Sequence, residues 1–238
     1  RLGLSRDILK ADGTPSFGIT RGFVQEALKG GAPVFEWLHM DSTGKVIPCE
    51  VRLVRLPSSG GNLIRASIID ITERKQAELV AAGERRALEK IASSEPLAGA
   101  LSAITEVVER VLPHAVCCIR MYDPVRRTLY HVVGESLPRE YVALMDNYPA
   151  EIRFGSCAAA VSLQRQIIVP DISKDALWEY RREAATRAGL KACWSTPILG
   201  ADGRILGTFA AYLKRTGMPS RRDLELVGRM AQLAKIAI

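Results

Sequence analysis

Two cysteines lie at positions where the surrounding sequence could make their thiols reactive. Cys157 follows Gly155 and Ser156 at the predicted start of a helix over 157–163, with Ser156 as the N-cap. Unpaired backbone N–H groups and the helix dipole favour a thiolate there, which is the nucleophilic form of cysteine. Thiol redox chemistry at Cys157, with Cys193 as a candidate disulfide partner, is one interpretation. A cysteine that simply packs at a helix start is the other.

A predicted hairpin within residues 189–213 supplies a second group of chemical side chains. Two apolar stretches, ACWSTPIL and RILGTFAAYL, flank Asp202-Gly203, a pair that suits a tight reversal. Alternation along a strand places Cys193 and Ser195 on one side and Trp194 on the other. Thiol and hydroxyl groups on one face indicate the wall of a small-molecule pocket, or else a core in which neighbours satisfy them. The candidate pocket residues are Cys157, Trp178, Cys193, Trp194, Ser195, Phe209 and Tyr212.

The composition excludes several classes of function. Of 238 residues, 47% are hydrophobic and 25% charged, as in a globular protein with its own core. The net charge of +7 is spread over separate pairs such as Arg126-Arg127, unlike the basic stripe of nucleic-acid-binding proteins. Five cysteines without metal-binding spacing predict a reducing cytoplasm and no metal site. No apolar run could span a membrane within this segment. The first residue is Arg1 rather than Met, which indicates a segment of a longer protein.

The first part of the chain predicts a short helix and a three-stranded antiparallel meander. The helix covers residues 21–28 and ends before Gly30-Gly31. Two strands lie within residues 34–56, on either side of a Ser-Thr-Gly turn, and a third covers 62–71 after the Pro57–Gly61 turn.

Residues 72–93 predict a long helix with a narrow apolar stripe between charged faces. Such a stripe favours a two-stranded coiled coil, although Gly83 weakens it. A single helix packed on its own domain is the alternative. The last segment, 220–238, predicts a second amphipathic helix. The predicted dimer and signalling residues are Ala77, Val80, Ala87 and Ile91 in the first helix and Leu224, Val227 and Ala231 in the last.

The region between these two helices mixes short helices with strands, which predicts an α+β fold. The predicted helices cover residues 97–111, a short stretch after Pro138, 157–163 and 178–188, and the predicted strands cover 115–122, 129–134, 167–171 and the hairpin.

Two sets of motifs resemble known signalling domains. FEWLHMDSTGKVIPCEVRLVRLP followed by DITERKQAE resembles the C-terminal half of a PAS domain and its junction with a signalling helix. FGSCAAAV, IIVPDISKDALW, GLKACWSTPI, GRILGTFAAY and the closing AQLAKIAI resemble a GAF domain. The resemblance implies a partial PAS domain over 1–71, a signalling-helix linker over 72–95 and a GAF domain with a six-stranded antiparallel sheet over 96–238. Arg1–Thr20 is too short for the N-terminal elements of a whole PAS domain.

This pair of domains resembles the input regions of bacterial cyclic-di-GMP enzymes, which carry GGDEF and EAL domains. The resemblance implies a cytoplasmic sensory module that is a homodimer through its helices, binds an unidentified small molecule in the GAF pocket and is covalently attached to an output domain after Ile238. The input region of a sensor histidine kinase is the alternative. No GGDEF, EAL or phosphoacceptor-histidine motif occurs in these residues, so we expect no catalytic residue and no enzyme activity in this segment.

The familiar cofactors of the two families are not expected here. Haem-binding PAS domains present a histidine from the helix before the meander, and residues 21–28 contain none. The flavin class needs a cysteine in an NCRFLQ-like stretch, which is absent. Bilin-binding GAF domains place a histidine in the segment before Gly189 and another where this chain has Tyr212. The ligand is therefore left open.

Free-methionine-sulfoxide reductases are a catalytic GAF branch with a cysteine in a GxCG-like motif that matches Cys157. Their partner cysteine belongs in the loop that Asp175–Trp178 occupies, which has no cysteine. The resemblance leaves a thiol-dependent reductase using Cys157 as a second alternative.

Overall fold

The computed structural model describes residues 16–58, 61–93 and 95–238, and the side chains from Thr20 onward. The chain divides into two compact units, one ending at Glu78 and the other covering Leu79–Ile238. Each unit is described by itself. Most of Arg1–Thr20, and part of the predicted turn after Pro57, lie outside the described residues.

The first unit is a helix on a three-stranded antiparallel sheet. Helix α1 (Ser16–Leu28) precedes β1 (Val34–Met40), β2 (Val46–Leu56) and β3 (Leu63–Asp70), in the sheet order β1-β2-β3. The three predicted strands are thus present. Their assignment to the PAS family stays a prediction.

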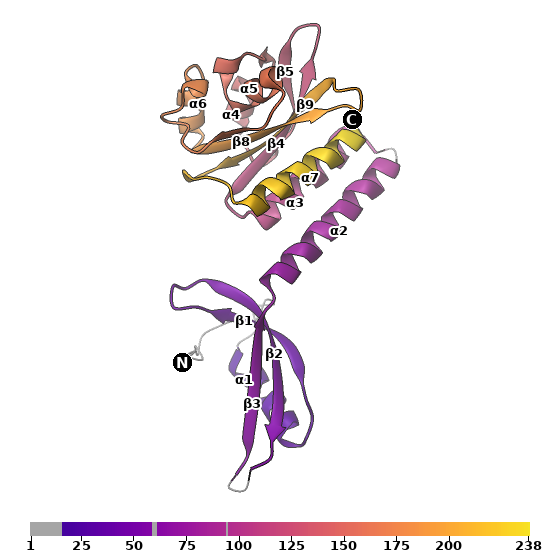
Figure 1. Cartoon of the computed structure of the whole chain (residues 1–238), viewed down its shortest axis with the longest axis vertical. Helices are drawn as coiled ribbons and strands as arrows, with labels where there is room; N and C mark the ends of the chain where they lie inside the picture. The colour runs from indigo at the N-terminus through magenta and orange to yellow at the C-terminus, as the bar shows by residue number, and fades with distance from the viewer. Residues whose placement is uncertain (1–15, 59–60, 94) are drawn as a thin grey trace. The chain divides into compact units, whose positions relative to one another are not determined.

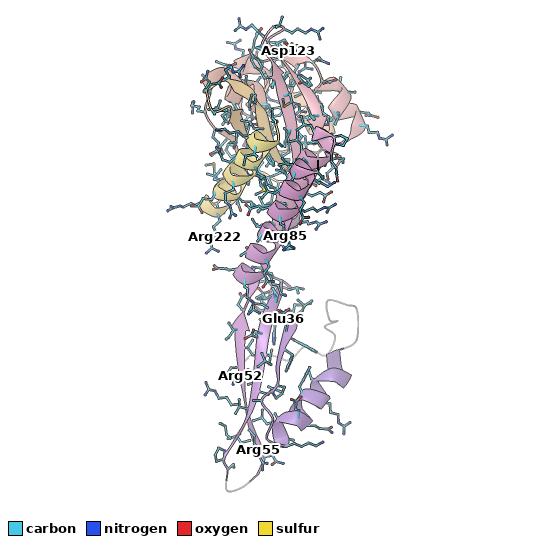
Figure 2. The ribbon with its side chains drawn as sticks, turned by 90° about the vertical axis from the view of Figure 1, so that its right-hand side faces the viewer. Glu36, Arg52, Arg55, Arg85, Asp123 and Arg222 are labelled. Atoms are coloured by element: carbon cyan, nitrogen blue, oxygen red, sulfur yellow. The ribbon has the colours of Figure 1, made fainter. Side chains whose placement is uncertain are left out.

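A small apolar core and one arginine connect α1 to this sheet. Val51 and Leu53 of β2 are buried against Ala27 of α1, and the rings of Phe23 and Phe35 stack with centroids 3.9 Å apart. The exposed side chain of Arg55, labelled in Figure 2, donates to the carbonyl of Leu28 at 3.0 Å and so satisfies an acceptor at the end of α1.

Helix α2 (Thr72–Ala92) crosses the boundary between the units. Its first turn is held by ion pairs to the meander, because Arg74 reaches Glu50 at 3.0 Å and Lys75 reaches Glu36 at 2.7 Å. These pairs are exposed, so each contributes little to stability.

The predicted apolar stripe of α2 packs inside the second unit. Val80 and Ala87 are buried there and Ile91 packs against the same cluster, whereas Ala77 is exposed in the first unit. In the last helix Val227 and Ala231 are buried and Leu224 is half-buried. Most of the predicted dimer residues therefore contact their own chain, and the homodimer itself stays a prediction.

The second unit is a six-stranded antiparallel sheet with helices on both faces (Figure 1). The strand order is β6-β5-β4-β9-β8-β7. This confirms the predicted fold of the C-terminal region. The elements are α3 (Leu97–Val111), β4 (Ala115–Asp123), β5 (Thr128–Val133), α4 (Arg139–Leu144), β6 (Tyr148–Pro149), η1 (Ile152–Phe154), α5 (Ser156–Leu163), β7 (Ile167–Val169), η2 (Ala176–Trp178), α6 (Arg182–Arg187), β8 (Ala192–Leu199), β9 (Ile205–Leu213) and α7 (Arg221–Ala237).

The two faces of this sheet carry different cores. Helices α3 and α7 lie side by side over one face and pack with α2 on an apolar cluster that we call the helix-side core. Helices α4, α5 and α6 belong to the opposite face, where a second cluster forms the site-side core. Alternation along β8 assigns Cys193 to the site-side core and Trp194 to the helix-side core, as predicted.

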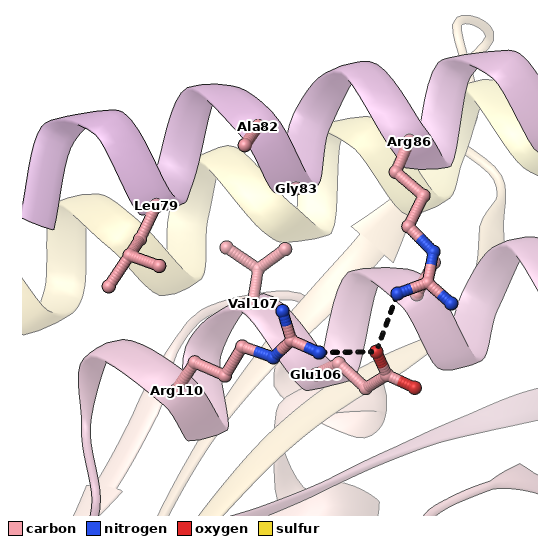
Figure 3. Close-up of a pocket in the computed structure, with 8 residues that line it drawn as sticks. Leu79, Ala82, Gly83, Arg86, Glu106, Val107 and Arg110 are labelled. Atoms are coloured by element: carbon pink, nitrogen blue, oxygen red, sulfur yellow. Dashed lines mark hydrogen bonds and ion pairs between the residues drawn. The ribbon is translucent and has the colours of Figure 1, made fainter. Parts of the chain in front are cut away.

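Helix α2 passes so close to α3 that only glycine fits at the crossing. A Cβ atom on Gly83 would lie 2.2 Å from Cγ2 of Val107. Beside this crossing, Glu106 of α3 accepts from Arg86 of α2 at 3.3 Å and pairs with Arg110 at 3.6 Å (Figure 3). Gly83, which weakens the helix as a coiled coil, is the residue that permits this packing.

Two local predictions need correction, and one short strand was not predicted. The helix predicted over 178–188 is broken into η2 and α6, because Arg181 has non-helical backbone angles and the Asp175 side chain caps η2 by accepting from the N–H of Leu177. The predicted strand 167–171 ends at Val169, before a proline that cannot donate to the sheet. The two-residue strand β6 was too short to leave a periodic signal.

Among the helices that the structure describes, none combines the length and the apolar character needed to cross a membrane.

Candidate functional site

A fully buried arginine lies at the centre of the site-side core. Arg120 occupies β4 in the otherwise apolar stretch AVCCIRMY and is 0% exposed. It shares a sheet face with Cys118, two residues earlier. Its backbone is pressed against β9, since a Cβ atom on Gly207 would lie 2.2 Å from the Arg120 carbonyl oxygen. The strand pairing thus fixes where this guanidinium lies.

The guanidinium is surrounded by weak acceptors. Its Nη1 lies 2.7 Å from the Sγ of Cys118, 3.2 Å from the hydroxyl of Tyr212 and 3.8 Å from the Sγ of Cys157. Its Nε donates to the carbonyl of Met145 at 3.3 Å. In the described part of the chain, no carboxylate lies within ion-pair distance of Arg120. A buried charge without such a partner is costly, so its counter-charge must come from another group.

Cys157 is the protein group best placed to supply that counter-charge. Gly155, with φ at 105°, begins α5, and this backbone geometry places Cys157 in the first turn. The Sγ of Cys157 lies 3.4 Å from Oγ of Ser195 and 3.7 Å from the hydroxyl of Tyr212. The hydrogen bond from Cys193, with the charge of Arg120 and the two hydroxyls, lowers the pKa of Cys157 to about 5 despite burial.

The pKa values of the two neighbouring thiols, Cys118 and Cys193, shift in the opposite direction. Burial raises the pKa of Cys118 to about 12, and burial together with the hydrogen bond to Cys157 raises the pKa of Cys193. Cys118 is closer to Arg120 than Cys157 is, but Cys157 also receives hydrogen bonds from Cys193 and Ser195, which Cys118 does not. We therefore assign the single thiolate to Cys157. The described residues group no three His, Cys, Asp or Glu side chains as metal ligands.

The predicted capping role of Ser156 is wrong. The N-cap of α5 is Gly155, and no side chain caps this helix start. The Ser156 hydroxyl is buried and accepts from Nε1 of Trp178 at 2.9 Å. The Trp178 ring in turn meets the Tyr212 ring edge-on, with centroids 6.2 Å apart. Ser156 thus anchors an aromatic wall of the site.

Two further tyrosines complete the wall. The ring of Tyr141 meets that of Tyr212 edge-on at 5.9 Å. Two guanidiniums lie near the ring of Tyr148, with Arg120 at 5.9 Å and Arg181 at 5.7 Å from its centroid. Among the described residues, Nη2 of Arg120 and the hydroxyls of Tyr141 and Tyr148 are buried without a hydrogen-bond partner.

The structure brings together five of the seven predicted pocket residues. Cys157, Trp178, Cys193, Ser195 and Tyr212 meet around Arg120. Trp194 and Phe209 instead lie in the helix-side core, across the sheet.

Sequence reasoning missed Arg120, Tyr141 and Tyr148. For Arg120 a signal existed, since a single charged residue inside an apolar strand must be either buried with partners or at an edge. Tyr141 and Tyr148 lie in and after a helix of six residues, which carried no such signal.

A family model of the GAF domain matches residues 94–238. The chain belongs to the GAF domain family. The Methyl sulfide methyltransferase-associated sensor of Methanosarcina acetivorans is 34% identical over 171 residues, which are 72% of this chain and 17% of that protein. The chain therefore spans about a sixth of the length of the curated relative it matches.

Solved structures of low sequence identity share the fold. Residues 122 to 287 of a methyl-accepting chemotaxis protein give a TM-score of 0.53 at 19% identity, covering 66% of this chain and 95% of that one. The free methionine-R-sulfoxide reductase of Neisseria meningitidis, in complex with its substrate, gives 0.52 at 14% identity, covering 68% and 87%. The GAF domain of the Acinetobacter phosphoenolpyruvate-protein phosphotransferase gives 0.51 at 17% identity, covering 66% and 92%.

These comparisons confirm the GAF resemblance and correct one expectation. The expectation of no enzyme activity, which was drawn from missing output-domain motifs, is contradicted, because chains of the same fold include free methionine-R-sulfoxide reductases. The PAS and cyclic-di-GMP resemblances and the cytoplasmic location stay predictions.

Proposed function

We propose that this chain is the sensory input segment of a longer signal-transduction protein, and that its GAF domain binds a small molecule at the Arg120 cluster. The observation that carries the proposal is a fully buried arginine among thiols and tyrosines in the site-side core. A domain built only for packing gains nothing from a buried charge, because apolar residues of the same volume are often as stable. The sensor named among the relatives supports the same function.

The sheet offers a route by which a ligand could act on the helices. On β9, Tyr212 belongs to the site-side core, while its neighbour Ala211 belongs to the helix-side core beneath α3 and α7. A ligand that shifts β9 would therefore change the packing of α7, provided that it binds one packing more tightly than the other. The resemblance favours a cyclic-di-GMP enzyme after Ile238 as the receiver, with a histidine kinase as the alternative, both in the cytoplasm.

Thermal unfolding in the presence of a panel of small metabolites tests the proposal. A compound that binds the folded state at a concentration of 100 Kd stabilises it by about 2.7 kcal/mol. We expect at least one compound to raise the Tm of the 238-residue chain, and Tyr212→Phe to reduce that rise. The matched control is Tyr130→Phe, at a partly exposed position of β5. A panel without any stabilising compound would contradict the proposal.

Thiol chemistry at Cys157 is a second candidate function, favoured by its contact with Arg120 and by the hydrogen bond from Cys193. The Cys157 thiolate would attack the sulfur of a sulfoxide, and the Cys193 thiol would then close a disulfide with Cys157. In sum the sulfoxide gains two electrons and two protons and leaves as a sulfide, its oxygen leaves as water, and the two thiols become one disulfide. An external dithiol would restore both thiols.

Turnover of free methionine sulfoxide with an added dithiol tests this candidate. Cys157→Ser should abolish turnover, whereas Cys117→Ser, which lies in the helix-side core, should leave it intact. Activity that survives Cys157→Ser, or no activity in the unaltered chain, would dismiss the candidate.

A further inference from the structure

We propose that the ligand of this site carries a small carboxylate, which binds Nη2 of Arg120 together with the hydroxyls of Tyr141 and Tyr148. This inference rests on the proposed sensory function and names the chemical class that the site recognises.

The first step is the set of unpaired groups in the site-side core. In the described residues, Nη2 of Arg120 and the hydroxyls of Tyr141 and Tyr148 have no hydrogen-bond partner, although each side chain is at most 2% exposed. A buried polar group without a partner costs about 1–3 kcal/mol, and a charged one costs more. Three such groups in one cluster indicate that a partner is supplied from outside the chain.

The second step is the location of these groups. Arg120 lies against the face of the Tyr148 ring and donates to the Tyr212 hydroxyl, and the Tyr212 ring contacts Tyr141. The unpaired groups therefore belong to one cluster rather than to separate defects in packing.

The third step is the chemistry that would satisfy all three groups. Each can donate a hydrogen bond, and one of them carries a positive charge. The ligand must therefore accept several hydrogen bonds, and an anionic acceptor suits Nη2, the side of the guanidinium that Cys157 does not reach. A carboxylate meets both requirements, because its two oxygens accept several hydrogen bonds and pair well with a guanidinium. The Cys157 thiolate does not fill this role, since it lies at Nη1, 3.8 Å away, and leaves Nη2 without an acceptor.

Arg181 strengthens the preference for an anion. Its guanidinium stacks on the Tyr148 ring at 5.7 Å and on the Phe154 ring at 5.6 Å, and its Nη1 donates to the Leu144 carbonyl at 3.2 Å. Its Nε is also buried without a partner among the described residues. Two cations near one tyrosine ring give this corner of the site a positive field, which attracts anionic ligands.

Matched pairs of ligands provide the test. Acetate, propionate and benzoate are each compared with their neutral amides by thermal unfolding and by calorimetric titration of the whole chain, with ionic strength held constant by sodium chloride. We expect the carboxylates to bind and to raise the Tm, and the amides to bind more weakly by about tenfold or more, since hydrogen bonds to a charged group are stronger.

Three variants locate the binding. Arg120→Met should weaken carboxylate binding by about tenfold or more and still fold, because apolar replacements of buried charges are tolerated. Tyr141→Phe and Tyr148→Phe keep their rings, so each is informative even if Arg120→Met does not fold, and each should weaken binding several-fold. Arg85→Met and Tyr130→Phe, which alter exposed or partly exposed positions, should bind as the unaltered chain does.

The outcomes separate this inference from the proposed function. Equal binding of carboxylates and amides, or unchanged carboxylate binding in the Arg120 and tyrosine variants, would overturn the inference. Stabilisation by a neutral or cationic metabolite alone would also overturn it and leave the sensory function standing. A chain that binds neither the carboxylates nor any compound of the metabolite panel would overturn both.

Discussion

Arg120 and Cys157 show how one residue can determine the chemistry of its neighbours. Arg120 lies close to two thiols, yet the pKa values of those thiols move in opposite directions. Burial and the charge of Arg120 act on both thiols, so the difference comes from the hydrogen bonds that Cys193 and Ser195 make to Cys157. A single thiolate in the cluster avoids two like charges in a buried space.

The titration of Cys157 is the first prediction at this scale. With a pKa of about 5, Cys157 should show the ultraviolet absorbance of a thiolate throughout the neutral range, and this absorbance should disappear on acidification through about pH 5. Cys157→Ser should remove it and Cys117→Ser should not. A thiolate signal that appears only in the alkaline range would contradict the assignment.

The lowered pKa of Cys157 also makes the stability of the fold depend on pH. The folded-state pKa of Cys157 lies below the ordinary value of 9.0, so the thiolate stabilises the fold fully above that ordinary value and loses its contribution as the pH falls through about 5. The difference in free energy of unfolding between the unaltered chain and Cys157→Ser, measured with urea, should therefore grow as the pH rises from about 5. A difference that is constant with pH would contradict this linkage.

The sequence predicts part of the site and misses its centre for a physical reason. Alternation along β8 and the motif around Cys157 are local patterns, and they single out Cys193, Ser195 and Cys157, which the structure brings together. The meeting of Arg120 with Tyr148 depends on the pairing of β4, β5 and β6, which no local pattern specifies.

At the scale of elements, the long amphipathic helices and the short helices after Pro138 and around Cys157 were predictable, but the break between η2 and α6 was not. The helix predicted over 97–111 coincides with α3, whose apolar residues repeat at helical spacing over fifteen residues. The segment around Trp178 has too few residues for such a signal, and the side chain of Asp175 decides its local geometry. Side chains that cap a helix therefore set helix boundaries that apolar periodicity alone does not predict.

The crossing of α2 and α3 leads to a prediction at the scale of elements. Gly83→Ala should lower the free energy of unfolding by about 1–3 kcal/mol, because the new methyl group overlaps Val107. Gly228→Ala in α7 is the matched control, since a Cβ atom there would have no neighbour within 4 Å and alanine favours a helix by up to about 1 kcal/mol. Chemical denaturation measures the free energy of unfolding of both variants. Equal changes for the two substitutions would contradict the close packing of α2 against α3.

On the scale of the whole chain, the GAF domain has one sheet with two distinct faces. The site-side core contains the buried polar cluster, and the helix-side core contains the terminal helix α7 that leads to Ile238. The motif resemblance predicted this domain well because its motifs are spread along the whole sheet. The resemblance could not reveal which residues of α2 contact their own chain. The same apolar stripe could pack against a second copy of the helix or against the domain of its own chain.

The contrast between buried and exposed apolar residues of α2 and α7 allows the predicted homodimer to be tested. Val80 is buried in the helix-side core, whereas Leu88 of α2 is 46% exposed and Ile236 of α7 is 63% exposed. If dimers form along these helices, Leu88→Glu and Ile236→Glu should weaken dimerisation with little change in Tm, because each places a charge in the contact between chains. Val80→Glu should instead lower the Tm, since it buries an unpaired charge in its own chain. Sedimentation velocity over a concentration series measures the first effect, and Val125→Glu, at a loop position that is 91% exposed, should alter neither property. A chain that sediments as a monomer at every concentration would refute the helical dimer.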